Sequence, residues 1–376
     1  MMIYKSFKFE LILNNEQIRF LRKNFGCVRF ISNNALAWHN KCRESGSKLR
    51  FDSRDAIREL ESWKKEFPWL NEYQPQIIKE AIRDLETAFK HYYAKRLAYP
   101  RFKAKGVKDS FRVTEGFKVE QQNNRCYLPE IGWIRYINSR EIKGTIRSIT
   151  ISYKSKKFFI SILALLEAKS VNHPEREVGI DLGIAQFATL SNGVIYTPLS
   201  VYKKYRIYAQ KLEKQLKNKQ LYSNNREKLK DKLAKLHSKM ANCRKDFLHK
   251  LSDKLTKRYR QIYVEDLKIN RMATSGNLLS KKELVDNKKE LNKSIMDQAW
   301  YEFRRQLEYK SNWRGGKSIK VSSVNTSKEC PICHFISSEN RPYRGLFKCV
   351  RCHYSNNADI VGALNVLARG RILAKS

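Results

Sequence analysis

Two pairs of cysteines near the C-terminal end constrain the fold of this chain more than any other feature of its sequence. The pairs are Cys330 with Cys333 and Cys349 with Cys352, each in a C-x2-C spacing. A C-x2-C turn places two thiolates on one side of a metal ion, and a second such turn completes a tetrahedral site without an open position. The sequence therefore predicts a structural zinc site within residues 326–356. Two disulfides or buried free thiols are the alternative, and they fit this spacing less well.

The residues around these cysteines suggest a second use for the module. His334 and His353 each follow a cysteine directly, but four thiolates already fill the site, so we expect both histidines to be bystanders. Basic side chains are spread through the same stretch: Arg341, Arg344, Lys348 and Arg351. A zinc ribbon that carries such residues could also contact nucleic acid, and the two roles are compatible.

The chain carries a large excess of positive charge. Its 376 residues include 76 Lys+Arg against 37 Asp+Glu, which gives a formal net charge of +39. Such an excess repels itself in the folded state unless a polyanion neutralises it, so a nucleic acid is a more probable partner than a membrane surface. A hydrophobic content of 41% is enough to build real cores, so we expect a globular protein of two or three domains.

No segment predicts export or membrane insertion. The first residues, MMIYKSFKFELIL, alternate polar and apolar positions and lack the apolar core of a secretory signal. The longest apolar run, at 158–166, is far shorter than the roughly 20 residues of a membrane helix. We therefore expect a cytoplasmic protein without a membrane partner, and a reducing compartment argues further against disulfides.

Hydrophobic periodicity separates strands from helices in the first half of the chain. Residues 3–13 alternate as a strand does. Later segments space their apolar residues by three or four, as helices do: 15–25, 28–44, 53–65 and 75–95. Short β-branched and aromatic runs between 110 and 166 then predict several strands. We expect residues 1–13 and 97–170 to form one β-barrel, with residues 14–96 inserted as a helical domain.

The second half alternates strands with helices, which indicates an α/β domain. Strands are expected within 177–196, around a turn at Ser191-Asn192-Gly193, then at 261–267 and in GGKSIKVSSV. Helices are expected over the segments 201–221, 226–260, 295–310 and 360–368, with a polar loop at 270–292. We assign residues 171–325 and 357–376 to this domain, and residues 326–356 to a zinc-binding insertion within it.

Three acidic residues lie at the ends of predicted elements. Asp181 follows the apolar run VGI, Glu265 follows IYV, and Asp359 precedes the last predicted helix. Acids from two strand ends and a helix start can converge at one end of a sheet and hold two Mg²⁺ ions. In such a site one ion activates water and the other stabilises the leaving oxygen of a phosphodiester. Taken alone, each acid is more typical of a turn or a helix cap. Asp266 is a rival ligand, but alternation places it on the opposite side of the strand.

These motifs, in this order, resemble a known family. GIDLGI, VEDL, TSKECPIC with CVRC, and NNADIVGALNVL are similar to the RuvC-like nuclease core of transposon-encoded TnpB proteins, which are compact relatives of type V CRISPR effector nucleases. FGCVRFISNNALA, YPRFK, DFLHKLS and YEFRRQLEYKSNWRGGK also look like that family. The resemblance therefore covers essentially the whole chain.

The resemblance implies a fold, a chemistry and partners. It implies an α+β multidomain protein: a wedge-like β-barrel, an inserted helical recognition domain, and an RNase H-like α/β nuclease domain that carries the zinc ribbon. It implies that Asp181, Glu265 and Asp359 are the catalytic, Mg²⁺-binding acids and that the four cysteines of the two C-x2-C pairs bind zinc. The implied activity is cleavage of double-stranded DNA next to a short adjacent motif, guided by an RNA encoded at the transposon end.

One motif departs from the family's pattern. Family members often read Asp-Arg-Asp-x-Asn before the last helix, whereas this chain reads Asn-Ala-Asp-Ile-Val over residues 357–361. The third acid, Asp359, is retained, so we expect an active nuclease. Two other functions use the same features: a DNA-strand transferase on the same RNase H-like core, and an RNA-guided DNA-binding repressor with weak or no cleavage.

Overall fold

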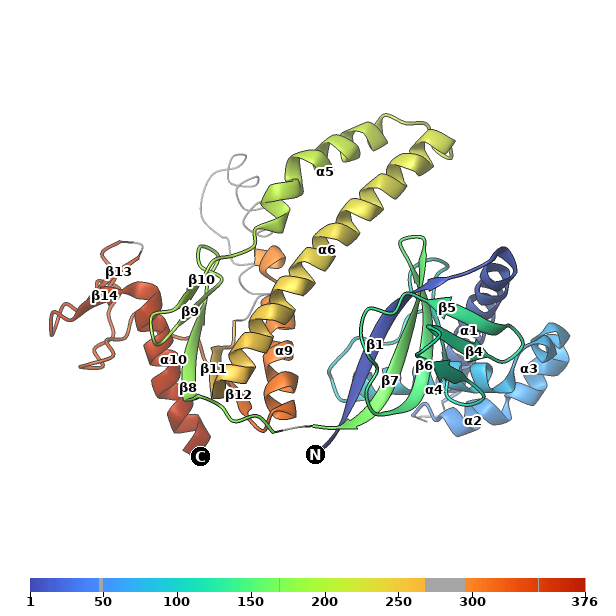
Figure 1. The fold of residues 1–376 in the computed structure, drawn as a ribbon, viewed down its shortest axis with the longest axis horizontal. Helices are drawn as coiled ribbons and strands as arrows, with labels where there is room; N and C mark the ends of the chain where they lie inside the picture. The colour runs from blue at the N-terminus through green and yellow to red at the C-terminus, as the bar shows by residue number, and fades with distance from the viewer. Residues whose placement is uncertain (47–49, 169, 268–294, 344, 376) are drawn as a thin grey trace. The chain divides into compact units, whose positions relative to one another are not determined.

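The computed structural model describes residues 1–46, 50–168, 170–267, 295–343 and 345–375. The chain forms two compact units: Met2–Glu167, and Ala168–Ser376 together with Met1 (Figure 1). Each unit contains helices and a β-sheet, which confirms the predicted mixed α/β content. The polar loop predicted at 270–292 lies outside the described residues.

The N-terminal unit is built on a seven-stranded sheet in the order β2-β6-β7-β1-β5-β4-β3. Its strands are β1 (Met2–Ile12), β2 (Asp109–Val113), β3 (Lys118–Glu120), β4 (Arg125–Leu128), β5 (Gly132–Tyr136), β6 (Thr145–Lys154) and β7 (Lys157–Glu167). Alternation along β1 buries Phe7, Phe9 and Leu11. The strand β1 pairs antiparallel with β7 and with β5, so the predicted pairing of the N-terminal strand with later strands is confirmed.

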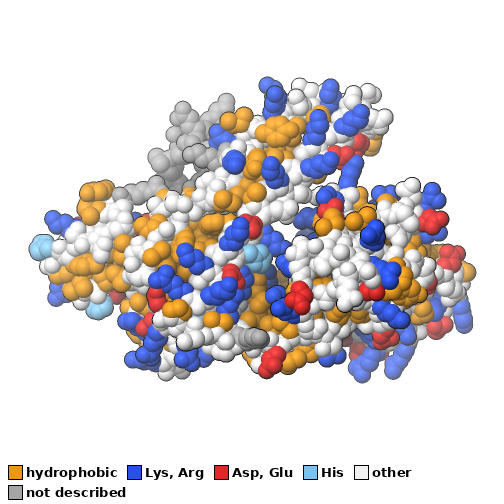
Figure 2. Space-filling model, in the orientation of Figure 1, with side chains coloured by type: hydrophobic (Ala, Val, Ile, Leu, Met, Phe, Trp, Pro, Cys, Tyr) orange, Lys and Arg blue, Asp and Glu red, His pale blue; other side chains and the backbone are white. Residues whose placement is uncertain are grey.

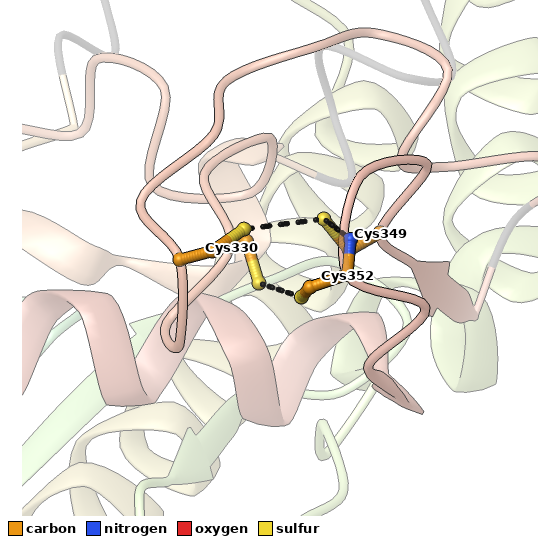
Figure 3. Close-up of side chains that lie close together, drawn as sticks. Cys330, Cys349 and Cys352 are labelled. Carbon is orange, nitrogen blue, oxygen red and sulfur yellow. Dashed lines mark hydrogen bonds between the residues drawn. The ribbon is translucent and has the colours of Figure 1, made fainter.

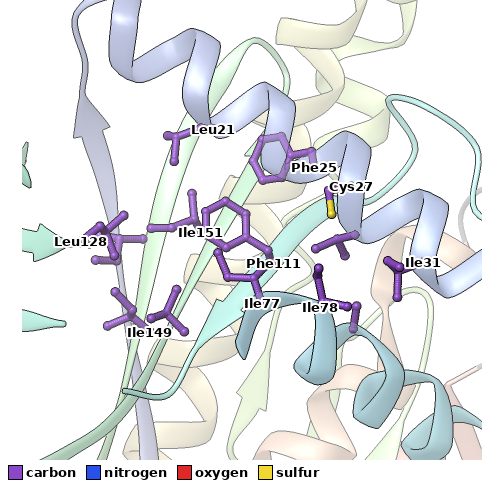
Figure 4. Close-up of a cluster of buried hydrophobic side chains, with 14 of the residues drawn as sticks. Leu21, Phe25, Cys27, Ile31, Ile77, Ile78, Phe111, Leu128, Ile149 and Ile151 are labelled. Carbon is purple, nitrogen blue, oxygen red and sulfur yellow. The ribbon is translucent and has the colours of Figure 1, made fainter. Parts of the chain in front are cut away.

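Helices of the same unit share one hydrophobic core with this sheet. They are α1 (Asn15–Glu44), α2 (Ser53–Arg58), α3 (Leu60–Glu66), the 3-10 helix η1 (Pro68–Glu72) and α4 (Pro75–Tyr93). Figure 4 shows Leu21 and Phe25 of α1 and Ile77 of α4 lying against Phe111 and Ile151 of the sheet. The apolar positions that predict these helices therefore form the helix faces that the sheet covers.

Two predicted helix boundaries in this unit are wrong. Residues 15–44 form one helix, because Gly26 keeps helical geometry inside it and a capping box of Asn14 and Gln17 starts it. The helix predicted at 53–65 divides at Glu59 into α2 and α3. The helix predicted at 75–95 is confirmed as α4, which has Pro75 in its first turn.

The C-terminal unit contains a five-stranded sheet in the order β10-β9-β8-β11-β12. Its strands are β8 (Glu175–Leu182), β9 (Ala188–Leu190), β10 (Ile195–Tyr196), β11 (Tyr259–Glu265) and β12 (Lys317–Val321). The strands β8, β11 and β12 run parallel, whereas β9 and β10 form an antiparallel hairpin. The predicted strands of this half are confirmed, as is the turn before β10, where Gly193 has φ +85°.

The described helices of this unit are α5 (Val201–Lys217), α6 (Asn224–Arg258), α9 (Trp300–Trp313) and α10 (Ala358–Lys375). The helices α5 and α6 lie side by side as a long hairpin, joined by a small apolar core around Leu212 and Leu236 (Figure 1). Two predictions need correction. The helix predicted at 295–310 is interrupted at Ala299, where φ is 52°, and the last helix is longer than the predicted 360–368. Within the described part of the chain, no helix is both long and apolar enough to span a bilayer.

Helices cover the parallel strands on both faces. Ile180 and Val264 point to one face, where they pack with Phe303 of α9. The alternate position Tyr263 points to the other face, where it packs with Val366 of α10. The odd-numbered residues at the carboxyl ends of β8 and β11 therefore face α10.

The helix α10 lies unusually close to the sheet, because glycines form the contact. A Cβ atom on Gly179 of β8 would lie 2.2 Å from the carbonyl oxygen of Ala363 and 2.7 Å from the backbone nitrogen of Leu367. A Cβ atom on Gly370 would lie 2.2 Å from the ring of Tyr263. The backbone of the helix therefore rests directly on the strands, which only glycine permits.

We predict that Gly179→Ala destabilises the C-terminal unit by about 1–3 kcal/mol or more, because the added methyl meets backbone atoms that cannot move aside. Gly26→Ala is the matched control, since a Cβ atom there has no neighbour within 4 Å and replacing a mid-helix glycine stabilises a helix by about 0.5–1 kcal/mol. Urea denaturation of the two variants measures both effects. Unchanged stability of Gly179→Ala would contradict the close packing.

Candidate functional site

The cysteine module consists of two turns with the same backbone geometry. The amide of His334 donates to the carbonyl of Cys330 at 3.0 Å, and the amide of His353 donates to that of Cys349 at 3.0 Å. Both histidines have positive φ values, 57° and 62°, so each occupies the left-handed position that closes its turn. Repetition of one turn is what allows four sulfur atoms to face a common point.

The four sulfur atoms form a compact group. The sulfur of Cys330 lies 3.5 Å from that of Cys352, and the sulfur of Cys333 lies 3.6 Å from that of Cys349 (Figure 3). All four lie within 4.8 Å of one another. A tetrahedral zinc site with Zn–S bonds of about 2.3 Å has sulfur atoms about 3.8 Å apart, so the group could hold zinc. Neither histidine belongs to the group.

The module is attached to the start of α10. Its hairpin of β13 (Leu346–Lys348) and β14 (Ser355–Asn357) runs directly into the helix. Cys330, Cys349 and Phe347 share a small core with Ala358 and Val361 of α10. A metal ion bound to the cysteines would therefore hold the first turn of α10, where Asp359 lies. The predicted decorating residue Arg344 lies outside the described residues.

Alternation and register bring Asp181 and Glu265 together. Ile180 of β8 pairs with Val264 of β11 in parallel register, so the next residues, Asp181 and Glu265, are neighbours at the carboxyl ends of the two strands. Both point toward α10, because the flanking residues point to the opposite face. Asp266 takes that opposite direction and forms an ion pair with Arg304 of α9, as alternation predicts.

The two carboxyl groups perturb each other. Burial raises the pKa of Asp181 well above its ordinary value, and the charge of Glu265 and a hydrogen bond to it raise it further. Burial also raises the pKa of Glu265, against hydrogen bonds from Thr326 and from the Leu182 amide that lower it. Glu265 is 4% exposed. Two neighbouring carboxylates disfavour each other's ionised forms, and among the described residues the charges of Arg341 and Arg369 offset this only in part.

Asp359 lies in the first turn of α10, and its charge also raises the pKa of Asp181. The helix start is capped by Asn357, whose side-chain oxygen accepts from the Asp359 amide at 2.9 Å. Asp359 is therefore not itself the cap, and its carboxylate is not used by the helix end. The glycine one turn later, Gly362, lets α10 approach Asp181, since a Cβ atom there would lie 3.2 Å from the Asp181 carboxyl carbon.

Sequence reasoning missed three residues that shape this site. Gly362 and Thr326 contact the acid pair, and Arg341 of the cysteine module lies near enough for its charge to lower the pKa of Asp181. Arg341 was expected only as a surface residue of the module. The position of Gly362 three residues after Asp359 was a sequence signal for its role. The contacts of Thr326 and Arg341 depend on how a loop folds back, which the sequence does not show.

Oxygen ligands of this kind suit a hard divalent cation. Asp181 and Glu265 lie side by side, the charges of Asp359 and Arg341 act on Asp181, and burial already disfavours the ionised forms of Asp181 and Glu265. Carboxylate oxygens are the ligands that Mg²⁺ prefers, and a divalent ion would supply the missing positive charge. The donor set therefore fits Mg²⁺ at the acids, just as the four thiolates fit zinc.

Three family models match the sequence. Residues 154–276 match a family described as probable transposase, residues 300–366 match the Cas12f1-like TNB domain, and residues 1–48 match a helix-turn-helix domain. In the structure, the last of these segments contains strand β1 followed by the unbroken helix α1. The order of the matches follows the order of the motifs along the chain.

Full-length relatives identify the family. The chain is 40% identical over 371 residues to the Escherichia coli K12 protein named "Putative RNA-guided DNA endonuclease InsQ", which covers 97% of this chain and 92% of that protein. It is 28% identical over 383 residues to a "Putative RNA-guided DNA endonuclease" of Streptomyces pristinaespiralis, covering 98% and 90% of the two chains. It is 31% identical over 182 residues to the "TnpB-like protein MJ0751" of Methanocaldococcus jannaschii, covering 48% and 62%. The chain belongs to the TnpB family of transposon-encoded proteins, related to Cas12f.

Solved structures share the fold at low sequence identity. The cryo-EM structure of the Cas12f1-sgRNA-target DNA complex has a TM-score of 0.55 and 13% identity, covering 97% of this chain and 98% of that chain. The mini-RNA-guided endonuclease CRISPR-Cas_phi3 has a TM-score of 0.50 and 11% identity, covering 100% and 93%. This chain therefore shares its fold with these two structures.

We predict that Cys349→Ser loses bound zinc and loosens residues 326–356, because zinc binding contributes about 10–16 kcal/mol in comparable small zinc modules. Zinc content and hydrogen exchange of the module measure the effect. Cys243→Ser, in α6 and outside the sulfur group, is the matched control and should retain zinc. A Cys349→Ser protein with full zinc content and unchanged exchange would refute the site.

We predict that Asp181→Asn stabilises the protein by about 0.5–2 kcal/mol at neutral pH in buffer without added divalent cation, because it removes a buried like charge at a functional site. A carboxyl group whose folded pKa is raised binds more protons in the folded than in the unfolded state, so wild-type stability should fall as pH rises through that pKa. Urea denaturation as a function of pH measures both effects. An Asp181→Asn variant less stable than wild type would contradict the repulsion between the acids.

Proposed function

We propose that this protein is an RNA-guided DNA endonuclease that hydrolyses phosphodiester bonds at Asp181, Glu265 and Asp359. The carrying observation is that strand register places Asp181 beside Glu265, and that Asp359 in the first turn of α10 lies near enough for its charge to raise the pKa of Asp181. The family membership supports the same function, since the relative with 40% identity is named as such an endonuclease. The class of reaction is metal-assisted hydrolysis.

The three acids would hold two Mg²⁺ ions, which when bound supply an activated water and stabilise the leaving oxygen of the phosphodiester. The chain contributes the positions of its side chains. Glu265 is held by Thr326 at 2.7 Å, and Asp181 is enclosed by β8, β11 and Gly362 of α10. Arg341 lies on the module side of the acids and is suited to bind a phosphate oxygen of the DNA.

The cysteines would hold zinc as a structural ion, since four thiolates leave no open position for chemistry. We propose that the zinc ribbon at 326–356 interrupts a RuvC-like nuclease domain of residues 171–325 and 357–376. In the N-terminal unit we propose a wedge β-barrel from residues 1–13 and 97–170 with the helices of 14–96 as the recognition domain. These finer boundaries follow from the family resemblance and are compatible with the strand order described.

The proposed partners are a guide RNA encoded at the transposon end and target double-stranded DNA. The formal charge of +39 supports two polyanionic partners. In this arrangement the guide reads the target by base pairing, and the protein reads duplex shape and a short adjacent motif. These partners would place its action in the prokaryotic cytoplasm.

Two alternative functions make different products. A DNA-strand transferase on the same core would yield joined DNA ends and would not require a guide RNA. One matching family is described as probable transposase, which supports this alternative. A guided repressor would bind DNA without cutting it. Retention of all three acids favours the nuclease over the repressor.

We predict that Asp181→Ala and Asp359→Ala each abolish guide-directed cleavage while retaining the guide RNA and zinc, because the acids are not members of the sulfur group and would carry the metal chemistry. Cleavage of guide-matched DNA in Mg²⁺, with sequencing of the RNA that copurifies, measures both properties. Asp266→Ala is the matched control, since that side chain points to α9. Cleavage by Asp181→Ala at the wild-type rate, or cleavage that needs no RNA, would sink the proposal.

A further inference from the structure

Thr326 connects the loop before the cysteine module to the acid pair. Its hydroxyl donates to Oε1 of Glu265 at 2.7 Å, and the two side chains are 3% and 4% exposed. Thr326 lies in the loop between β12 and Cys330, whereas Glu265 ends β11. One buried hydroxyl therefore touches a proposed catalytic carboxylate from a part of the chain that the acid motifs do not include.

Asn365 of α10 holds this loop in place. Its side-chain amide donates to the carbonyl of Thr326 at 2.7 Å and to the carbonyl of Glu329 at 2.8 Å. Asn365 is 3% exposed, so both bonds are made in a buried setting where an unpaired group would be costly. The second carbonyl belongs to the residue before Cys330, so the bond also reaches the edge of the sulfur group.

Arg369, one turn further along α10, fastens the same loop from outside. Its guanidinium donates to the carbonyl oxygens of Ser322 and Val324 and forms an ion pair with Glu329. Together Asn365 and Arg369 fix the loop at residues 322–329 against the helix that carries Asp359. The backbone position of Thr326 is therefore set by these contacts with α10 and does not depend on the Thr326 side chain.

Glu265 needs such support because a carboxylate on a strand end can rotate about its terminal bonds. The Thr326 hydroxyl has a second acceptor, the Ser323 carbonyl at 3.1 Å, but the shorter bond is to Glu265. Groups that hydrogen-bond a metal ligand orient it, and losing them typically costs about 10–100-fold in metal affinity or activity. Thr326 has the chemistry and the location of such a group.

We infer that Thr326 is a positioning residue for Glu265: its hydroxyl orients the carboxylate for a divalent cation, and the loop anchored by Asn365 and Cys330 holds the hydroxyl in place. The cysteine module thereby acts on the acids through a hydrogen bond as well as through α10. The inference rests on the proposed function and adds a residue to that site. It assigns the hydroxyl, not the bulk of the side chain, as the acting group.

The test compares Thr326→Val, which keeps the shape and removes the hydroxyl, with Thr326→Ser, which keeps the hydroxyl. The full chain with its guide RNA is used, Mn²⁺ binding is measured by electron paramagnetic resonance without DNA, and cleavage is measured against Mg²⁺ concentration. Thr326→Val should weaken Mn²⁺ binding and raise the half-saturating Mg²⁺ concentration by about 10–100-fold. Thr326→Ser should restore both toward wild type.

The controls separate positioning from stability. Thr256→Val removes another buried hydroxyl, on α6, and should leave Mn²⁺ binding unchanged. Zinc content and melting temperature show whether Thr326→Val folds; if it does not, Thr326→Ala replaces it, because the carbonyl that Asn365 binds is retained in any side-chain variant. A folded variant without the hydroxyl that binds Mn²⁺ as wild type does would overturn the inference. Loss of binding in Thr326→Ser equal to that in Thr326→Val would also overturn it.

The outcomes distinguish this inference from the proposed function. If the wild-type complex cuts guide-matched DNA and Thr326→Val has an unchanged metal dependence, the inference fails and the nuclease stands. If hydroxyl loss weakens Mn²⁺ binding but the wild-type complex cuts no DNA, the proposed function fails and the role of Thr326 as a support for Glu265 stands.

Discussion

The seating of α10 on β8 and β11 is the contact on which the site depends. Gly179 and Gly370 remove the side chains that would hold the helix away, so the helix backbone meets the strands directly. The same close packing brings Asp359 near Asp181, because Gly362 has no side chain that would hold α10 away from Asp181. An added Cβ atom would overlap backbone atoms of α10 at Gly179 and the ring of Tyr263 at Gly370, and at Gly362 it would press on the Asp181 carboxyl group.

The cysteine module reinforces this contact from the outside. It shares a core with the first turn of α10, and its preceding loop is bonded to the later turns through Asn365 and Arg369. A zinc ion bound by the four thiolates would be a cross-link without reactivity, and its contribution would be to hold the helix and the loop in one position. The module and the acids are thus connected through α10 and the loop at 322–329, although they are separate motifs in the sequence.

The pairing of Asp181 with Glu265 opposes folding. Burial and mutual repulsion raise the pKa values of Asp181 and Glu265, which means that the ionised pair is less stable than the protonated one in the folded chain. Among the described residues, the charge of Arg341 lowers the pKa of Asp181 and the charge of Arg369 lowers the pKa of Glu265, yet both pKa values remain raised. The site remains short of positive charge, which is the condition that favours binding of a divalent ion.

Much of the candidate site could be predicted from the sequence, because it depends on local rules of spacing and alternation. The spacing of the cysteines determines that their thiolates can meet, and the two-residue period of a strand determines that Asp181 and Glu265 face one side and Asp266 the other. Other features required the tertiary structure. The periodicity predicts a break between residues 25 and 28, where α1 is continuous, and it does not predict the break at Ala299. The bond from Thr326 to Glu265 joins residues 61 positions apart, and it exists only because a loop is folded back onto α10.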